Sequence, residues 1–593
     1  MNIFKIPWLD SFIQRFRSSE FAFGTTLAVT VGIAAGLGAV AFRWLISFFH
    51  NTAFYHGAEI LGFLGQYYVV LIPILGGLMV GLLIHFSGAK ETQGHGVPEV
   101  MDAVANAGGR IRARVAVVKT LASSITIGSG GSVGREGPIV QIGSAMGSIL
   151  AQRFYLSQEW IKTLVACGAA GGISATFNAP IAGVFFAHEI ILGRIFTRHF
   201  GFVVMSSVVA GVIAHAFLGD LQSFSIPTYT LSSYWELGLY FVLGTACAII
   251  AVIFVRTLYK TEDIFDAASL PEYVKPALGG VAIGLIGLYN PYLFGVGYDG
   301  VEQALLGNIG LIALISLLLL KILATSFTLG SGGSGGIFAP SLFMGAMFGG
   351  IFGNIANRLL PGIVAPSGAY ALVGMAAVFS AAARAPITAI IILFEMTRDY
   401  AIILPLMLAV VVSTLIAYRL SPESIYTLKL KRRGISYQLS EEIDLLEKVT
   451  VNEVMTRNFP TVSPELTFAE IVKKFATSSH HGFPVVDKAG GLKGMVTLAD
   501  VEAKMSSSYQ KLTVADIATT RLITAYPDES LHDVVYRLGG SEVGRIPVVD
   551  RKNPTLLLGV LRRHDIVKAY AKAASKLSKG SNRNVSTGSS SIS

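Results

Sequence analysis

Two glycine-rich segments of nearly the same sequence hold the residues best able to do chemistry in this chain. Residues 128–138 run GSGGSVGREGP and residues 330–340 run GSGGSGGIFAP, a constant offset of 202 positions (330 − 128). In both, glycines lead to a proline and then to a charge-free run, which is typical of the start of a helix. The segments differ in one conspicuous place, because Glu136 in the first stands where Phe338 stands in the second.

A helix that begins within apolar surroundings presents unpaired N–H groups and the positive end of its dipole, so it attracts anions without a formal charge. A third segment, Gly94-His95-Gly96-Val97-Pro98, has the same order of glycine and proline. We therefore expect three helix starts to converge on one anion. The carboxylate of Glu136 can occupy such a site when it is charged and leave it when it is protonated.

The composition indicates that these segments lie in a membrane. Only 14% of the 593 residues are charged and 52% are hydrophobic, whereas a soluble protein carries about a quarter charged residues. Several charge-free runs reach the roughly 20 residues that a spanning helix needs. These runs are Phe21–Phe42, Thr163–Ala187, Pro276–Tyr298, Pro340–Asn357 and Tyr400–Tyr418. We expect a polytopic membrane protein in which shorter, interrupted helices escape a hydropathy count.

The charged and sulfur-containing residues exclude other classes. The net charge of +9 comes without a basic stripe interleaved with aromatic residues, so nucleic acid is not an expected partner. The basic residues suit cytoplasmic loops, as at Arg110, Arg112 and Arg114. Cys167 and Cys247 lie in apolar runs and are expected to be small core residues rather than a disulfide.

The two ends of the chain differ from its middle. Residues 1–20 mix aromatic and basic side chains, and Ile3–Phe16 is expected to be a helix lying on the membrane surface. No signal-peptide pattern opens the chain, so we expect cytoplasmic termini and a location in a bacterial inner membrane. Residues 573–593 are serine-rich and are expected to be disordered.

A second pair of matching segments indicates that the membrane part was duplicated. Asn178-Ala179-Pro180-Ile181, followed by Glu189, matches Arg384-Ala385-Pro386-Ile387, followed by Glu395. Two motifs that repeat at nearly the same offset imply two homologous halves, and broken helices that meet at a repeat interface favour an inverted arrangement. We interpret Glu189 and Glu395 as structural residues that pair at helix ends.

The last quarter of the chain is soluble and carries its own repeat. Phe483-Pro484-Val485-Val486-Asp487 recurs as Ile546-Pro547-Val548-Val549-Asp550, and each copy follows a helical segment and precedes a second strand. This βαββα-like pair resembles tandem CBS domains, with boundaries expected at 446–508 and 509–572. The expected fold is an all-α membrane domain of two homologous, inverted repeats over 21–430, a linker over 431–445, and this α/β pair.

Four motifs in the membrane part resemble those of the CLC family of chloride channels and chloride/proton antiporters. The family's GSGIP pattern corresponds to Gly94–Pro98, GREGP matches Gly134–Pro138 in every residue, and GxFxP matches Gly336–Pro340. The family's late tyrosine corresponds to Tyr426. The resemblance implies a homodimer in a lipid bilayer, with a chloride pathway in each subunit and no required cofactor.

The resemblance also implies roles for single residues. Glu136 would be the gating glutamate that competes with chloride and carries protons. The residues implied to contact the anion are His95, Gly96, Ile337, Phe338 and Tyr426, with Ile337 and Phe338 offering backbone N–H groups and Tyr426 its hydroxyl.

Two departures from the family pattern leave the transport mode open. His95 stands where serine or proline is common, so its imidazole either contacts the anion and makes transport pH-dependent or turns into the protein. Ile190 stands where many antiporters carry an inner proton-transferring glutamate, and Glu189 lies about 100° away on a helix. The chain is therefore either an antiporter with another proton route or a passive channel gated by voltage or pH.

The CBS-like pair suggests an adenine nucleotide as a further ligand. Thr497 and Asp500 keep the Gly-x-x-Thr-x-x-Asp pattern that contacts nucleotides in that family, whereas the second copy has Arg562 with Asp565. The resemblance therefore allows ATP, ADP or AMP to bind, or a purely structural pair. His480 and His481 lack a further ligand, so no metal site is expected.

Two other functions fit parts of the sequence. Gly332-Gly333-Ser334-Gly335 has the form of a serine nucleophile motif, and His188 would be the base of an intramembrane protease. That alternative explains neither the duplication nor Glu136. A membrane receptor that senses nucleotide without transport would likewise leave an intramembrane acid unused.

Overall fold

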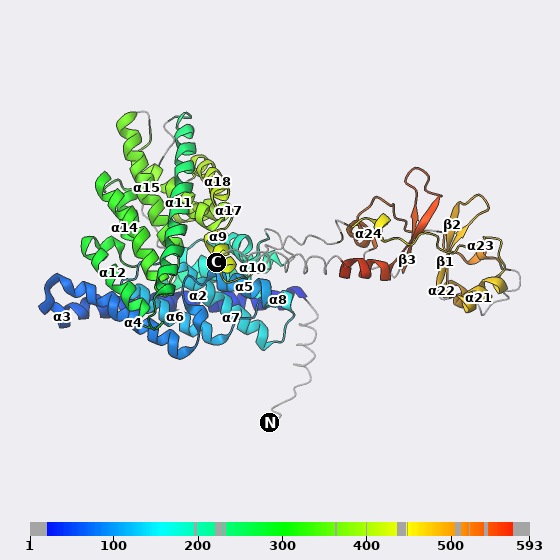
Figure 1. Cartoon of the computed structure of the whole chain (residues 1–593), viewed down its shortest axis with the longest axis horizontal. Coiled ribbons are helices and arrows are strands. Elements are labelled where there is room, and N and C mark those ends of the chain that lie inside the picture. Colours follow the sequence, from blue (N-terminus) through cyan, green and yellow to red (C-terminus); the bar gives the residue numbers. More distant parts are fainter. Residues whose placement is uncertain are drawn as a thin grey trace, which may run out of the picture. The chain divides into compact units, whose positions relative to one another are not determined.

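The computed structural model describes residues 20–194, 199–219, 229, 233–361, 364–398, 400–435, 446, 449–478, 480–504, 512–520, 522–538 and 544–572. The chain forms two compact units, Met1–Leu439 and Ser440–Ser593, drawn in Figure 1. The expected surface helix Ile3–Phe16 and the tail at 573–593 lie outside the described residues.

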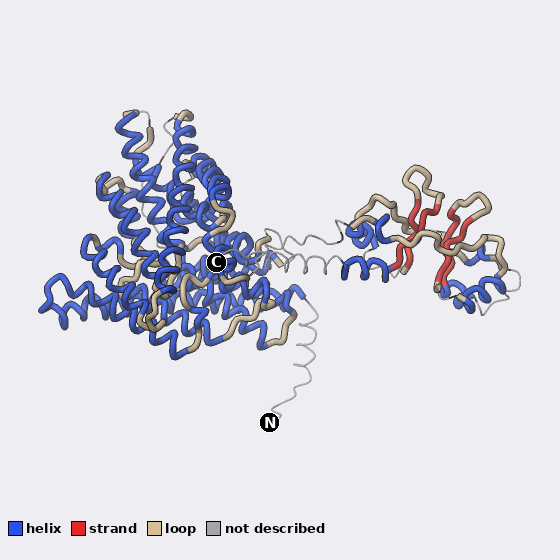
Figure 2. Tube along the Cα trace, in the orientation of Figure 1, coloured by secondary structure: helices blue, strands red, loops and turns tan. Residues whose placement is uncertain are grey.

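The described part of the first unit is helical (Figure 2). Its first half contains α2 (Glu20–His50), η1 (Asn51–His56), α3 (Gly57–Leu61), η2 (Gly62–Tyr67), α4 (Tyr68–Ser87), η3 (Lys90–Thr92), α5 (Val97–Asn106), α6 (Ala113–Gly128), α7 (Glu136–Arg153), α8 (Gln158–Phe177), α9 (Pro180–Phe186), η4 (Ala187–Leu192) and α10 (Phe200–Leu218). Its second half contains α11 (Glu236–Ala267), α12 (Lys275–Tyr289), η5 (Pro291–Leu293), α13 (Tyr298–Leu305), α14 (Leu311–Gly330), α15 (Phe338–Leu359), α16 (Ser367–Ala383), α17 (Pro386–Thr397), α18 (Ile403–Leu420) and α19 (Ile425–Arg432).

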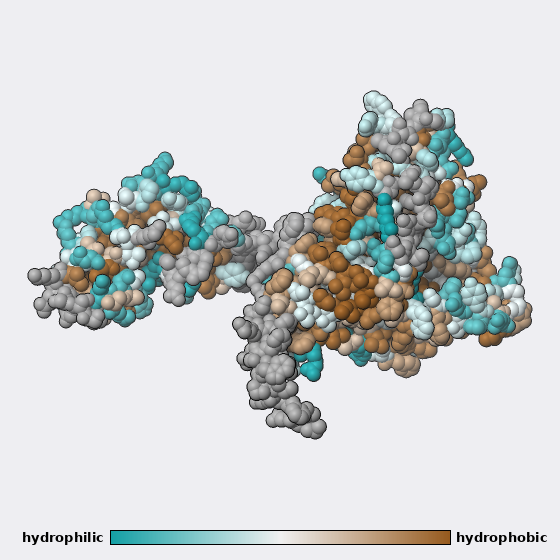
Figure 3. Space-filling model, turned by 180° about the vertical axis from the view of Figure 1, so that it is seen from behind, coloured by the Kyte–Doolittle hydropathy of each residue, from teal (hydrophilic) through white to brown (hydrophobic). Residues whose placement is uncertain are grey.

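Apolar helices of two lengths make up this unit. In the described part of the chain, seven helical stretches are long and apolar enough to cross a membrane, and four apolar helices are shorter. Hydrophobic side chains gather over a broad area of one face of this unit in Figure 3. The prediction that short, interrupted helices escape a hydropathy count is therefore confirmed.

Two of the five charge-free runs are not single helices. The run Thr163–Ala187 divides at Asn178, which adopts left-handed geometry (φ 55°) and ends α8 before Pro180 starts α9. The run Pro276–Tyr298 divides after Tyr289, where α12 ends. Proline lacks the N–H that would continue a helix and fits its first turn, so the chain turns at these positions within apolar sequence.

Matching contacts relate the two halves of the membrane unit. The N–H of Ser132 donates to Thr328 Oγ1 (3.1 Å), and the N–H of Ser334 donates to Thr126 Oγ1 (3.3 Å). Ser334 lies 202 positions after Ser132 (334 − 132), and Thr328 lies 202 positions after Thr126 (328 − 126), so the two contacts join corresponding residues of the two halves. Such exchange of matching contacts is what a two-fold relation between homologous halves produces. The inverted orientation of the two repeats stays a prediction.

Glycines let helices of each half approach closely. A Cβ on Gly168 would lie 1.9 Å from the carbonyl oxygen of Gly143, where α8 packs on α7, and a Cβ on Gly374 would lie 2.4 Å from that of Gly345, where α16 packs on α15. Small residues of this kind permit backbone contact between membrane helices. Cys167 and Cys247 are buried free thiols, which confirms their prediction as core residues.

The second unit contains two helix–hairpin modules. The first packs α21 (Phe468–Thr477), β1 (Gly482–Val486), β2 (Leu492–Thr497) and α22 (Leu498–Lys504) with α23 (Val514–Ile517), which follows them in the chain. The second packs α24 (Leu531–Leu538), β3 (Arg545–Val549) and β4 (Leu557–Arg562) with α20 (Val451–Val454), which comes from the start of the unit. Strands β1 and β2 pair antiparallel, as do β3 and β4, so the predicted α/β repeat is confirmed.

Candidate functional site

Three helix starts converge at the centre of the membrane unit, as the sequence predicts. The N–H of Gly134 donates to the carbonyl of Gly336 (2.7 Å) and the N–H of Gly336 donates to that of Gly134 (2.6 Å). The N–H of Gly94 donates to the carbonyl of Gly333 (3.0 Å). These bonds join the segments that lead into α5, α7 and α15, so their backbone groups surround one small volume.

Glu136 opens α7 at this point and is 1% exposed. One carboxylate oxygen, Oε1, accepts a hydrogen bond from the hydroxyl of Tyr298 (2.8 Å). The other oxygen, Oε2, faces the N–H of Ala339 near the start of α15 (3.4 Å). The carboxylate therefore already occupies a place where backbone N–H groups and a hydroxyl can hold an anion.

Gly134 provides the space for this carboxylate. A Cβ on Gly134 would lie 2.1 Å from Glu136 Oε2, closer than any real contact of that kind. Glycine is needed at position 134 because the Glu136 carboxylate lies so close to its backbone, and not because of its φ, which is ordinary.

Gly96 and His95 shape the start of α5. Gly96 is the residue before α5 and has a positive φ of 79°, and a Cβ there would lie 2.6 Å from Gln141 Oε1. The His95 ring is 5% exposed, its Nε2 lies 3.4 Å from the hydroxyl of Tyr259, and its Nδ1 has no hydrogen-bond partner within the described residues. The ring centroid of His95 lies 5.8 Å from that of Tyr426.

Tyr426 and Phe338 complete the set of predicted anion contacts. Both are buried, as is Ile337, the residue that precedes α15. The Phe338 ring packs between Phe177 (5.0 Å between centroids) and Phe379 (4.0 Å). The structure thus gathers the predicted site residues of the membrane unit around the convergent helix starts.

Sequence reasoning missed Tyr298 as a partner of Glu136. The segment Gly295-Val296-Gly297-Tyr298 lies 201 positions after Gly94-His95-Gly96-Val97 (295 − 94) and starts α13 as the earlier segment starts α5. The glycine spacing that these two segments share was the sequence signal that could have pointed to Tyr298. The segment is a fourth helix start, that of α13, at the same centre.

Two buried lysines support these matching segments and were also missed. Lys119 on α6 donates to the carbonyl oxygens of Thr92 (3.0 Å) and Gly94 (2.8 Å). Lys321 on α14 donates to those of Leu293 (3.4 Å) and Gly295 (3.1 Å). The lysines are 202 positions apart (321 − 119), so each half holds its own loop with one lysine side chain.

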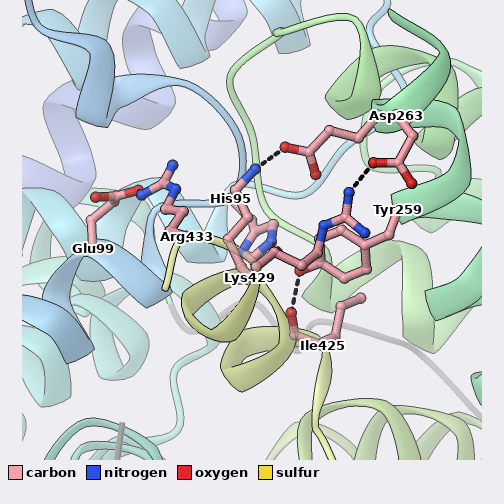
Figure 4. A network of polar contacts seen from close by, with 9 residues as sticks. His95, Glu99, Tyr259, Asp263, Ile425, Lys429 and Arg433 are labelled. Atoms are coloured by element: carbon pink, nitrogen blue, oxygen red, sulfur yellow. Dashed lines mark hydrogen bonds and ion pairs between the residues drawn. The ribbon is translucent and has the colours of Figure 1, made fainter. Parts of the chain in front are cut away.

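Helix α19, which begins with Ile425 and Tyr426, is held by a polar network (Figure 4). Tyr259 on α11 donates to the carbonyl of Ile425 (2.5 Å). Three ion pairs fix the other end of the helix: Lys429 with Glu262, Arg432 with Asp263, and Arg433 with Glu99. The network ties the position of Tyr426 to α11 and α5.

Two cavities adjoin this centre and share no lining residue. The vestibule cavity, about 550 Å³, is lined by Gln93, Gly94 and the ion-paired residues Glu262, Lys429, Arg432 and Arg433 among others. The gate cavity, about 210 Å³, is lined by Arg43, Arg135, His215 and Tyr298 among others. Tyr298 reaches from the gate cavity to Glu136, and Gly94 reaches from the vestibule cavity to the same centre.

Glu189 and Glu395 cap helices reciprocally. Glu395 accepts from the N–H groups of Ile181 (3.0 Å) and Ala182 (2.7 Å) at the start of α9. Glu189 accepts from those of Ile387 (3.1 Å) and Thr388 (2.8 Å) at the start of α17. Their interpretation as structural residues at helix ends is confirmed.

The protease alternative finds no support in the geometry. Ser334 Oγ donates to the carbonyl of Thr92 (2.7 Å) and contacts Ser123 Oγ (2.9 Å). His188 uses Nδ1 on the carbonyl of Val184 within its own helical segment (2.9 Å). A nucleophilic serine needs a base within hydrogen-bond reach, and these contacts direct the two side chains elsewhere.

The candidate nucleotide residues of the C-terminal unit differ in their local contacts. The N–H and Oγ1 of Thr497 both donate to Asp500 Oδ2 (2.8 and 2.7 Å). Asp565 instead accepts from Arg562 through Nε and Nη2 (both 2.8 Å). The first repeat therefore keeps the Thr–Asp pair, while the acid of the second repeat is engaged by an arginine.

Comparison with known proteins gives a consistent result. The sequence profile described as voltage gated chloride channel matches residues 76–418, and that of the CBS domain matches residues 451–506 and 514–572. The chain is 34% identical to a ClcB-like chloride channel protein of Ralstonia nicotianae, over 68% of this chain and 96% of that protein. It is 30% identical to the chloride channel protein CLC-f of Arabidopsis thaliana, over 88% of this chain and 76% of that protein. It is 33% identical to the H(+)/Cl(-) exchange transporter ClcA of Vibrio campbellii, over 72% of this chain and 92% of that protein.

Solved structures resemble the fold as well. The structure of a slow cyanobacterial Cl−/H+ antiporter superimposes with a TM-score of 0.65 at 27% identity and covers 71% of this chain and 98% of that one. The structure of a eukaryotic CLC transporter gives a TM-score of 0.59 at 19% identity and covers 91% of this chain and 97% of that one. At this identity the likeness concerns the fold alone.

Proposed function

The chain belongs to the voltage-gated chloride channel family, and on that basis we propose that it transports chloride through a pathway gated by Glu136. The observation that carries the proposal is the position of the Glu136 carboxylate, which accepts hydrogen bonds from Tyr298 and Ala339 where helix starts converge. An anion that reaches this place competes with the carboxylate for the same donors. Protonation of Glu136 removes that competition and frees the site.

Backbone amides and neutral hydroxyls suit a transported anion because they bind it without a permanent counter-charge. The residues proposed to supply these groups are Gly96, Ile337 and Phe338 through their backbone at the starts of α5 and α15, and Tyr426 through its hydroxyl on α19. Binding at such dipoles is weak enough for the ion to leave again. We assign the anion contacts to these residues together with His95.

We favour coupled exchange of chloride and protons. The antiporter structure at 27% identity and the exchange transporter of Vibrio campbellii support this mode. A passive chloride channel is the second candidate, because Ile190 is apolar and buried where a proton-transferring acid would be expected. In that candidate, Glu136 still gates the pathway but carries no protons from one side to the other.

Purified protein in liposomes distinguishes these modes. Liposomes loaded with chloride are diluted into a low-chloride medium, and a chloride electrode and a pH electrode record both ions. We expect chloride efflux that drives proton uptake. Chloride efflux without proton movement identifies a channel, and efflux no faster than from protein-free liposomes contradicts transport altogether.

His95 is proposed to contact the central anion through its ring. The support is its unpartnered Nδ1 and its place between Tyr259 and Tyr426. Exchange of His95 for serine is expected to change the relative flux of chloride and nitrate and its response to pH. Unchanged selectivity and pH response would mean that only backbone amides face the anion.

The C-terminal unit is proposed to bind an adenine nucleotide through Thr497 and Asp500. We assign Asp565 a weaker part in this site, because Arg562 engages its carboxylate in the structure. Binding of ATP, ADP or AMP to the full-length protein, measured by calorimetry with wild type and Asp500→Ala, tests this assignment. Equal binding by both proteins would place the nucleotide elsewhere.

The protein is an integral membrane protein, and we propose that it forms a homodimer with one chloride pathway in each subunit. A bacterial inner membrane with both termini in the cytoplasm agrees with its bacterial relatives and with the cluster of basic residues on α19. Mass measurement of the detergent-solubilised protein and protease access to the C-terminal unit in cells test these two assignments.

A further inference from the structure

We propose that Tyr298 is a latch: its hydroxyl holds Glu136 in the closed position and sets how readily chloride displaces that carboxylate. This inference rests on the proposed gating role of Glu136. It adds a positioning residue from the second half of the chain, whose side chain acts on the gate and not on the transported ion.

The hydrogen bond from Tyr298 is the shorter of the two contacts made from outside α7. Its donor–acceptor distance is 2.8 Å, against 3.4 Å from the Ala339 N–H to the other oxygen. A hydroxyl that donates to a charged carboxylate makes a stronger bond than one between neutral groups. Loss of the hydroxyl therefore weakens the carboxylate as a competitor of chloride.

Tyr298 is held firmly enough to act as a fixed point. It begins α13 directly after Gly297, which has left-handed geometry (φ 82°). Lys321 binds the carbonyl of Gly295 in the same loop, and the guanidinium of Arg135 lies 5.4 Å from the centre of the Tyr298 ring. A cation at that distance over an aromatic face is attractive. The loop is anchored on both sides, so Glu136 is the partner that moves.

The surroundings of the latch favour the arrival of an anion. Among the described residues that line the gate cavity there is no carboxylate, while Arg43, Arg135 and His215 line it together with Tyr298. Tyr426 on α19 is a further buried titratable group that interacts electrostatically with Glu136. An anion drawn into this cavity meets Glu136 at the Tyr298 hydroxyl, where the balance between carboxylate and chloride is decided.

A double-mutant experiment tests the latch. Chloride binding to full-length protein in detergent is measured by calorimetry for wild type, Tyr298→Phe, Glu136→Gln and the double variant. We expect Tyr298→Phe to bind chloride about tenfold more tightly than wild type, since the charged competitor has lost one hydrogen bond of roughly 1.5 kcal/mol. In the Glu136→Gln background the same change is expected to alter binding less than twofold.

The pH profile of transport gives a second readout. The hydroxyl stabilises the charged form of Glu136, so its removal is expected to shift the pH of half-maximal chloride flux upward by about one unit. Tyr289→Phe is the matched control, because its exposed hydroxyl contacts Ser316 (3.0 Å) and not the gate. Tyr298→Leu serves as a second variant that removes the hydroxyl by a different route.

Each outcome bears on the latch. An equal change in binding with and without Glu136 would make Tyr298 a structural residue and overturn the inference, as would no change in either background. If Tyr298→Phe binds chloride with the same affinity as wild type, the latch is contradicted while the proposed function stands. Absence of chloride binding in all four proteins would overturn the proposed function and the latch with it.

Discussion

At the scale of single residues, the position of the Glu136 carboxylate depends on what its neighbours lack as much as on what they offer. Gly134 lacks a side chain, so Oε2 can lie against its backbone, while Tyr298 offers the hydroxyl that Oε1 accepts. The proposed role of Glu136 follows from its place in a duplicated motif and from the resemblance to the CLC family. The glycine spacing around Tyr298 signals a helix start, but it does not say that the hydroxyl meets a carboxylate 162 residues away (298 − 136), which only the fold shows.

Exchange of Gly134 for alanine tests the steric part of this account. The new methyl group would lie 2.1 Å from Glu136 Oε2, so we expect the carboxylate to leave its closed position and chloride flux to lose its dependence on pH. Overpacking of this kind costs roughly 1–3 kcal/mol of stability. Flux is measured from liposomes and the melting temperature in detergent.

Gly201→Ala is the matched control for that exchange. A Cβ at Gly201, on α10, would meet nothing within 4 Å, so flux and melting temperature should equal those of wild type. A Gly134→Ala protein with wild-type pH dependence would show that the carboxylate does not rest against Gly134.

At the scale of elements, broken helices place polar backbone inside an apolar unit, and each break is compensated by a specific partner. Glu189 and Glu395 cap α17 and α9 across the two halves. The sequence predicted the breaks, because glycine and proline mark them. The reciprocity of the caps follows from the two-fold relation between the halves, which a linear pattern does not display.

Exchange of Glu395 or Glu189 for alanine tests these caps. Each exchange leaves two helix N–H groups without an acceptor in a partly buried place, which costs about 1–3 kcal/mol. We expect both variants to lower the melting temperature of the protein in detergent by a similar amount, with unchanged anion selectivity. Glu59→Ala, at a side chain that is 79% exposed, should leave the melting temperature unchanged, and an equally stable Glu395→Ala protein would contradict the capping role.

Capping boxes in the C-terminal unit make its stability depend on pH. Hydrogen bonds from the side chain and N–H of Thr467 lower the pKa of Glu470 below its ordinary value of 4.5. Those from the N–H and side chain of Thr513 lower the pKa of Asp516 below 3.8. A carboxyl with a lowered pKa in the folded state stabilises the fold above its unfolded pKa, and this contribution is lost as the pH falls through the folded pKa.

We therefore expect hydrogen-exchange protection of α21 and α23 in the full-length protein to fall as the pH drops below about 4.5. Exchange rates are compared after correction for the intrinsic effect of pH. The variant Glu470→Gln with Asp516→Asn should show less protection at neutral pH and a weaker pH dependence, whereas Glu502→Gln on α22 should behave as wild type. Equal pH dependence in all three proteins would rule out the capping boxes as its source.

At the scale of the whole molecule, two homologous halves enclose one pathway, and a separate α/β unit follows them. Composition, repeats and the motifs from Gly94 to Tyr426 were enough to predict this architecture and to select residues that the structure gathers around the convergent helix starts, whose anion contacts stay a proposal. Lys119 and Lys321 escaped prediction because a lone lysine in an apolar run gives no sign that it binds the carbonyl groups of a distant loop. The salt bridges of α19 escaped for the same reason, since their partners Glu99, Glu262 and Asp263 lie on helices far away in sequence.

The most direct test of the central claim compares wild type with Glu136→Gln in chloride-loaded liposomes. Chloride efflux and the pH of the medium are recorded together over a range of pH. For wild type we expect chloride efflux coupled to proton uptake and faster at low pH. For Glu136→Gln, which mimics the protonated gate, we expect chloride efflux to persist, proton uptake to disappear and the pH dependence to vanish. Coupled proton uptake that survives this exchange would contradict the assignment of Glu136 as the gate that carries the proton.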